Sequence, residues 1–283
     1  MRLIVVLAIV LGTAEAVYAQ GTPPVKLGND IVVAGSLRTR AEAWNFFPST
    51  FNDDYVFSGN IARFGLTQTK KRYDWQVEFA VPFLLGLPTD AIAPAPQGQL
   101  GFGASYFAAN DKDRNAGYLF VKQGSIRFKG LGGIDGQSLK VGRMEYIDGT
   151  EVAPGNGTLV AVKRDRIAHR LLGNFAFSHV GRSFDAAQYV LSNKKLNFTF
   201  LAGRPTRGAF QVDGKGDLKI NVFYGALTGQ TGMGANAGEW RVFGIGYRDY
   251  RNGIEDGSVL KVDNRATAAR SADHERINIG TFG

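Results

Sequence analysis

Strict alternation of apolar and polar residues is the feature of this sequence that most limits the folds open to it. From Tyr73 to Val81 every second residue is apolar, and the residues between them include Asp74, Gln76 and Glu78. A period of two indicates a β-strand with one apolar and one polar face. The pattern therefore predicts long amphipathic strands and argues against a helical bundle as the main architecture.

Similar alternation returns along most of the chain. Glycine, at 37 of 283 residues, suits the tight turns that join strands. We expect an all-β fold built from about ten strands. The expected strands are 31–45, 54–69, 72–81, 118–129, 139–146, 183–191, 195–203, 218–226, 240–250 and 276–282.

The expected connections fall into short and long ones. Short joins are expected at 70–71, 130–136 and 193–194, and long ones at 84–117, 147–182, 204–217 and 252–275. Short turns that alternate with long loops are typical of outer-membrane barrels. Within one long connection, residues 159–172 combine apolar residues at near-helical spacing with lysine and arginine between them. This spacing predicts a short basic helix.

The first residues predict export. Met1-Arg2 is basic, the run from Leu3 to Gly12 is apolar, and small residues around Ala19 fit a cleavage site. The apolar run is shorter than the roughly 20 residues of a membrane-spanning helix, and Glu15 interrupts its end. We expect residues 1–19 to be a Sec-type signal peptide and residues 20–283 to form one domain.

An exported chain with strands and no long apolar helix is a soluble envelope protein or an outer-membrane barrel. The strands are near the length of about 9–11 residues that a tilted membrane strand needs. Aromatic residues near strand ends predict an interfacial girdle. These are Trp44, Phe46, Phe47, Tyr55, Phe57, Tyr247 and Tyr250. We therefore expect an all-β transmembrane antiparallel β-barrel in the outer membrane, with an exported carbohydrate-binding β-sandwich as the alternative.

A barrel of this sequence would carry more basic than acidic residues on its polar faces, in line with the net charge of +8. Rings of arginine and lysine favour anions in a pore, and the arginine fork pairs well with carboxylates. The same charges could instead pair with one another and brace the inner wall. The residues expected to line the lumen are Arg38, Arg40, Glu42, Arg63, Asp74, Glu78, Arg127 and Asp185.

The residues also resemble a known family. The strand Leu139-Lys140-Val141-Gly142-Arg143, the later Asp148-Gly149 and the segment Phe184-Asp185 resemble the alginate export family of bacterial outer-membrane proteins. That family has a Leu-x-x-Gly-Arg strand, a Gly-Asp turn and a Phe-Asp-Gly segment, whereas here the turn order is reversed and Ala186 replaces the glycine.

The resemblance implies a porin-like conduit for an anionic exopolysaccharide, with Arg38, Arg40, Arg143 and Asp185 at its constriction. Barrels of that family have about eighteen strands, which need more chain than this sequence provides at about 9–11 residues a strand. We therefore expect a partial member of the family that lacks the last strands.

Catalysis is the remaining alternative. Asp53-Asp54 and Asp273-His274 match the residue types that ten-stranded outer-membrane proteases use to activate water. Such dipeptides arise easily by chance, so we expect no enzyme. With no cysteine, and with His169 and His179 expected in solvated loops, we expect no metal and no cofactor. The expected partners are an anionic polysaccharide or small organic anions, outer-membrane lipid and the barrel assembly machinery, and not nucleic acid.

Overall fold

The structure is a computed structural model, and it describes residues 22–45, 48–94, 97–193, 195–232, 237–250 and 274–282. The predicted signal peptide lies outside the described residues, as do Phe46, Phe47 and Asp273. Within the described ranges, no helix is both long and apolar enough to cross a bilayer.

All ten predicted strands are confirmed. Their bounds are β2 (Ile31–Trp44), β3 (Tyr55–Thr69), β4 (Tyr73–Leu85), β6 (Phe120–Lys129), β7 (Gln137–Met144), β8 (Phe184–Ser192), β9 (Leu196–Pro205), β10 (Ile220–Thr231), β11 (Gly238–Asp249) and β12 (His274–Phe282). Two short strands were not predicted, β1 (Thr22–Lys26) and β5 (Ala116–Gly117). Prolines at 23 and 24 in β1 obscure its pattern, and they suit an edge strand because proline donates no ladder hydrogen bond.

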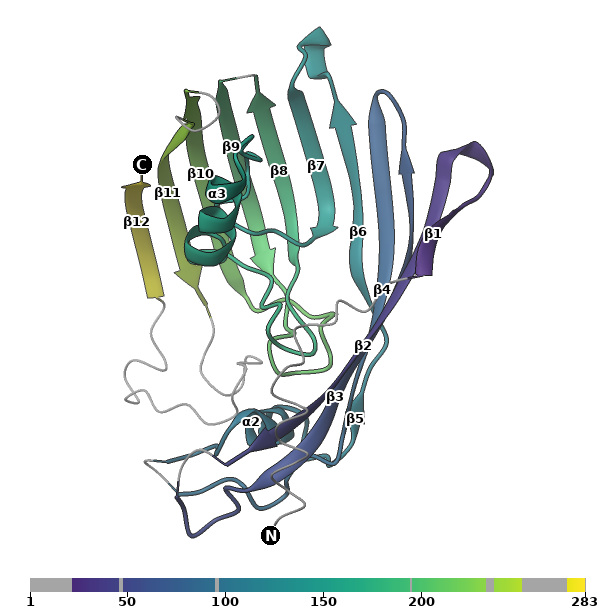
Figure 1. The fold of residues 1–283 in the computed structure, drawn as a ribbon, viewed down its shortest axis with the longest axis vertical. Coiled ribbons are helices and arrows are strands. Elements are labelled where there is room, and N and C mark those ends of the chain that lie inside the picture. Colours follow the sequence, from purple (N-terminus) through teal and green to yellow (C-terminus); the bar gives the residue numbers. More distant parts are fainter. Residues whose placement is uncertain are drawn as a thin grey trace.

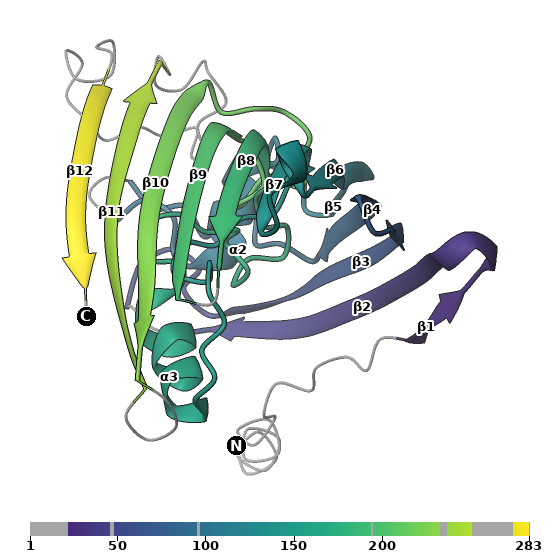
Figure 2. The same cartoon turned by 90° about the horizontal axis from the view of Figure 1, so that it is seen from above.

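The strands form one twelve-stranded sheet, in the order β1-β2-β3-β4-β6-β7-β8-β9-β10-β11-β12, with β5 paired to β4. Each strand pairs antiparallel with its neighbours. The sheet curves strongly, and α2 (Phe102–Ala109) lies within the curve (Figure 2). Strands β1 and β12 stand at the two ends of the order, and no pairing joins them in the described chain. All-β is therefore confirmed, and a two-sheet sandwich does not describe these strands.

The predicted alternation of connections is also confirmed where the structure describes them, and the long connection expected at 252–275 lies almost wholly outside the described residues. Short turns lie at one edge of the sheet and long connections at the other, which are the upper and lower edges in Figure 1. The connection between β7 and β8, residues 145–183, is called here the inner segment because it runs across the concave side of the sheet. It contains α3 (Gly157–Val162) and a π-helical turn (Lys163–Ile167). The predicted basic helix thus exists but begins and ends earlier than expected.

Strand register assigns each side chain to the concave or the convex face. Arg63 lies opposite Ala80, Asp74 opposite Arg127, and Arg127 opposite Lys140, so these residues share the concave face. A β-bulge at Lys122 interrupts the pairing of β6 with β4, between Val121 and Gln123. Because an extra residue reverses the alternation, Phe120 and Lys122 turn to the concave face. Unbroken alternation in the sequence would place Phe120 on the same face as Ile126 and Phe128, and the bulge is the reason that it does not lie there.

The long connections cover apolar parts of the concave face. Phe57, Leu84 and Tyr106 of α2 belong to one buried cluster, which Trp44 flanks. The Trp44 and Phe102 rings lie 4.9 Å apart, and the Tyr55 hydroxyl donates to the Leu100 carbonyl at 2.6 Å. The predicted interfacial girdle is therefore wrong for Trp44, Tyr55 and Phe57. These aromatic residues hold α2 against the sheet instead.

Candidate functional site on the concave face

Strand β2 carries Arg38, Arg40 and Glu42 on the concave face, two residues apart, as the sequence predicts. The two arginines donate to consecutive backbone carbonyls of the inner segment. Arg38 bonds to Ala176 at 3.1 Å and to Ser178 at 2.6 Å, and Arg40 bonds to Phe177 at 3.2 Å. Both guanidinium groups thus bind the protein's own backbone, an arrangement that the sequence did not predict.

Glu42 completes this contact. Its carboxylate lies 2.7 Å from Nε2 of His179, whose side chain is buried. The backbone NH of His179 donates to the Tyr106 hydroxyl at 2.8 Å. Burial raises the pKa of Tyr106 to about 12, so this hydroxyl stays protonated. The expectation of a solvated loop residue is therefore wrong for His179, whereas His169 is exposed.

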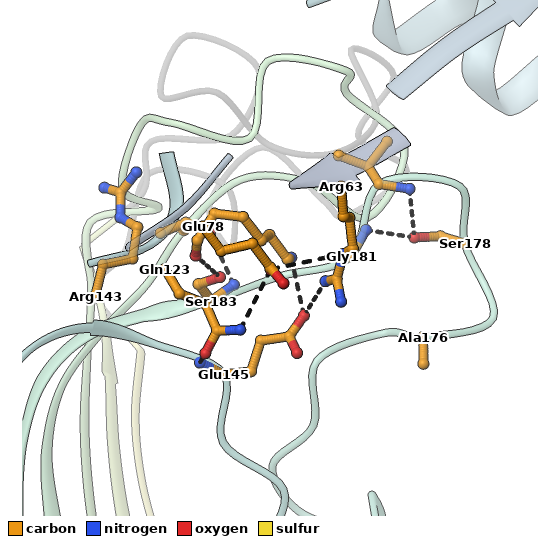
Figure 3. A network of polar contacts seen from close by, with 12 residues as sticks. Arg63, Glu78, Gln123, Arg143, Glu145, Ala176, Ser178, Gly181 and Ser183 are labelled. Carbon is orange, nitrogen blue, oxygen red and sulfur yellow. Dashed lines mark hydrogen bonds and ion pairs between the residues drawn. The ribbon is translucent and has the colours of Figure 1, made fainter. Parts of the chain in front are cut away.

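Arg63 of β3 lies in a second cluster on the concave face. It forms an ion pair with Glu145 and a longer one with Glu78, at 3.7 Å, and both carboxylates point toward it (Figure 3). Lys122, fully buried, lies 3.5 Å from Glu145. Burial acts to raise the pKa of Glu145, but the charges of Arg63 and Lys122 outweigh it, so the pKa lies below its usual range. Lys122 was not predicted as a site residue, because the alternation pattern does not indicate the face of a residue at a bulge.

Asp74 and Arg127 form a third pair, nearer the short-turn edge. Arg127 donates to both carboxylate oxygens of Asp74, and Lys129 lies 3.5 Å from the same carboxylate. A recess of about 320 Å³ opens beside this pair and is also lined by Lys140 and Gln76. No hydrogen bond or ion pair joins Lys140 to another described side chain.

Arg143 and Asp185 lie on the other face of the sheet. Arg143 lies opposite Gly124 of β6 and Asp185 of β8 in the sheet. Lys140 and Met144, at even-numbered positions of β7, point to the concave face, so Arg143 points to the convex face. It donates to both Asp185 oxygens at 2.7 Å and to the Lys215 carbonyl at 2.7 Å. In Figure 3 it points away from Arg63, Glu78 and Glu145. The prediction that Arg143 and Asp185 line the lumen with the other seven residues is therefore wrong. Successive side chains of a strand point to opposite faces, and the register puts these two residues on the convex face.

The far end of the inner segment is attached to β10 and β11. Lys163 donates to Glu239 of β11 at 2.6 Å, and both side chains are buried. Arg241 of β11 lies 3.5 Å from both Asp148 and Glu151. Burial raises the pKa of Asp148, although the backbone NH groups of Leu171 and Leu172 bond to its carboxylate. The inner segment therefore links β2 and β3 to β10 and β11 across the concave face.

The concave face is thus rich in charge, but most of that charge is paired. Seven of the nine predicted residues lie there, and each contacts an opposite charge or a backbone carbonyl. A pocket of about 190 Å³ remains between the strands and the inner segment, lined by Arg38, Arg63 and Glu145 among others. These contacts match the alternative in which the charged residues pair with one another and brace the inner wall.

Of the two acidic pairs that the sequence offered for catalysis, the structure describes the first. Asp53 accepts a hydrogen bond from the backbone NH of Ser49 at 2.7 Å and belongs to the turn between β2 and β3. In the described part of the chain, no group of three or more His, Asp and Glu residues could hold a metal ion. Asp273 of the second predicted pair lies outside the described residues.

Comparison with known proteins gives no identification: no family, no curated protein and no solved structure matches this chain. The resemblance to the alginate export family remains a prediction from short motifs. Arg143 of its Gly-Arg strand and Asp185 of its Phe-Asp segment form one ion pair on the convex face.

Proposed function

We propose that the chain is a porin-like β-barrel channel of the outer membrane that passes an anionic polysaccharide of the alginate type, or smaller organic anions. Passage is passive, and the protein contributes a polar wall within an apolar exterior. The proposal includes the outer-membrane location and the closure of the sheet.

The observation that carries the proposal is the chemistry of the convex face. Neighbouring strands expose large apolar side chains there, alternating with the concave set. They include Leu37, Phe64, Leu66, Phe128, Phe198, Phe200, Phe223, Leu227 and Val242. A soluble sheet would cover such a surface or make it polar, whereas lipid favours it. Most ion pairs of the strands, by contrast, lie on the concave face, where a membrane barrel holds water, and the Arg143–Asp185 pair on the convex face is an exception.

A lipid environment would also require the edges of the sheet to close. The outer edges of β1 and β12 carry backbone groups without a partner strand in the described chain. Lipid offers these groups no hydrogen bonds, so the edges must pair with each other or with another chain in a bilayer. Closure would turn the concave face into the lumen.

The anionic solute is supported by the cations that remain after pairing. Lys71, Arg72 and Lys140 make no side-chain hydrogen bond or ion pair with described residues. Free cations in a low-dielectric wall attract negative solutes. The paired arginines contribute less, because their charge is already matched.

The test combines a folding assay with a selectivity assay. A closed barrel folded in detergent migrates faster on a gel before heating than after, and it conducts ions in a planar bilayer. Under a potassium chloride gradient we expect the sign of the reversal potential to indicate anion preference. Lys140→Glu should weaken that preference, whereas Lys195→Glu, which makes the same charge change at the β8–β9 turn, should leave it unchanged. Absence of heat-modifiable migration and of conductance would overturn the proposal.

A further inference from the structure

A hollow beside the Asp74–Arg127 pair lies at the short-turn edge of the sheet. It measures about 700 Å³ and lies between the β3–β4 turn and the β6–β7 turn. The two turns are neighbours because β4 pairs with β6, and the backbone NH of Lys129 donates to the Arg72 carbonyl at 2.8 Å.

Its lining is strongly basic. Lys71, Arg72, Arg127 and Lys129 line it, and Asp135 is the only acidic side chain in the lining. Arg127 and Lys129 share Asp74 as a partner. Lys71 and Arg72 are exposed, and neither makes a side-chain hydrogen bond or ion pair with a described residue. Among the described residues the hollow therefore holds more positive than negative charge, since Lys71 and Arg72 have no carboxylate partner there.

The glycines of the β6–β7 turn leave its backbone open. Gly130, Gly132 and Gly133 have φ of +64°, +60° and +78°, and a Cβ built on any of them would meet nothing within 4 Å. These glycines are thus required by backbone conformation and not by packing inside the protein. No side chain covers the turn at these three positions, although the NH groups of Gly130 and Gly133 already donate to the carbonyls of Gln137 and Gly130.

The hollow continues onto the concave face. Arg127 lines both the hollow and the recess of about 320 Å³ that contains Lys140. The two spaces together present five cationic side chains, spread from the turns into the sheet, against Asp74 and Asp135. Cationic side chains that are spaced apart bind a polymer with repeated negative groups better than they bind a single small ion. Each cation can pair with a different negative group of the polymer.

We propose that this basic hollow is a binding site for a linear polyanion that carries repeated carboxylates, with Lys71 and Arg72 as its outer contacts and Lys140 as its innermost one. The site would recruit the chain to the mouth of the proposed channel. In that role it rests on the proposed function, although binding itself does not require a conducting channel.

The test is an equilibrium binding titration of the folded protein in detergent with a fluorescently labelled hexamer of galacturonate, and with neutral maltohexaose as the matched uncharged probe. We expect binding of the galacturonate hexamer that weakens as salt rises, and no binding of maltohexaose. Lys71→Ala together with Arg72→Ala should weaken the affinity by about tenfold or more. Lys71→Arg with Arg72→Lys should retain most of it, and Lys195→Ala should match the wild type.

The outcomes separate the site from the channel. Affinity that is unchanged in Lys71→Ala/Arg72→Ala overturns the site, even if the wild type conducts anions. Salt-sensitive binding that is lost in this variant supports the site, even if no conductance is found and the channel is rejected. Equal binding of maltohexaose would also overturn the site, because charge would not be the basis of recognition.

Discussion

Nε2 of His179 lies 2.7 Å from the carboxylate of Glu42, and this contact joins residues 137 positions apart in the sequence. The pair fixes where along β2 the inner segment lies. The neighbouring carbonyls of the inner segment accept hydrogen bonds from Arg38 and Arg40. The ring is buried beside Phe57 and Tyr106, with ring centroids 6.0 and 5.6 Å away. The contact is therefore fixed by packing as well as by the polar contact with Glu42.

A methyl group at Gly59 should break this contact. A Cβ there would lie 2.3 Å from Nε2 of His179, so Gly59→Ala must displace the imidazole or the strand. We expect a loss of about 1–3 kcal/mol in the free energy of unfolding, as for other overpacked sites. Thermal unfolding in detergent measures it. Gly244→Ala in β11, where a Cβ meets nothing within 4 Å, is the control, and an equal loss in both variants would contradict the explanation.

Lys163 and Glu239 should behave as a buried ion pair. Removing only the cation, in Lys163→Met, leaves a buried carboxylate without a counter-charge and should cost about 3–5 kcal/mol. The double variant Lys163→Met/Glu239→Leu should recover much of this stability. The exposed pair Arg164–Asp165, also at 2.7 Å, gives the comparison. Arg164→Ala should cost less than about 1 kcal/mol, and a similar cost for both cations would refute the role of burial.

Acid should weaken the Arg63 cluster. The pKa of Glu145 is lowered in the folded protein, so the folded state binds this proton less tightly than the unfolded state does. The stabilisation is complete above the unfolded-state pKa of about 4.3 and is lost as the pH falls through the lower folded-state value. We expect Glu145→Gln to be less stable than the wild type at neutral pH, and the difference to shrink toward about pH 3. A difference in melting temperature that stays constant with pH would contradict the assignment.

The convex face offers a direct test of its environment. Phe200, 41% exposed, would face lipid in the proposed barrel. Phe200→Arg should then cost about 2–4 kcal/mol and impair folding into liposomes, whereas Phe200→Leu should be tolerated. In a water-exposed sheet the same arginine would change stability by less than about 0.5 kcal/mol. The fraction of heat-modifiable protein after folding into liposomes distinguishes the two results.

Strand positions could be predicted because alternation is a local property. Faces could be predicted only while the alternation is unbroken, so the bulge misplaced Phe120 and hid Lys122. Arg143 was grouped with Arg38 through motif resemblance, and the register of β7 against β6 places it on the opposite face.

The partners of the charged residues could not be predicted. Arg38 and Arg40 bond to backbone carbonyls, and the path of a long connection is set by packing that no local pattern encodes. The basic hollow did leave a signal, since Lys71-Arg72 and the glycine-rich 130–136 both lie in short turns. Recognising it required the knowledge that β4 and β6 are neighbours.

The inner segment also implies an order of assembly. Strands that are joined by the short turns pair with their neighbours in sequence, and such hairpins close quickly. The contacts of Arg38, Arg40 and Glu42 instead wait for a segment almost 140 residues later, and closing so long a loop costs more entropy. We therefore expect the chain to pass through an intermediate with a formed sheet and an unfilled interior, in which β2 still presents its two arginines and its glutamate to solvent.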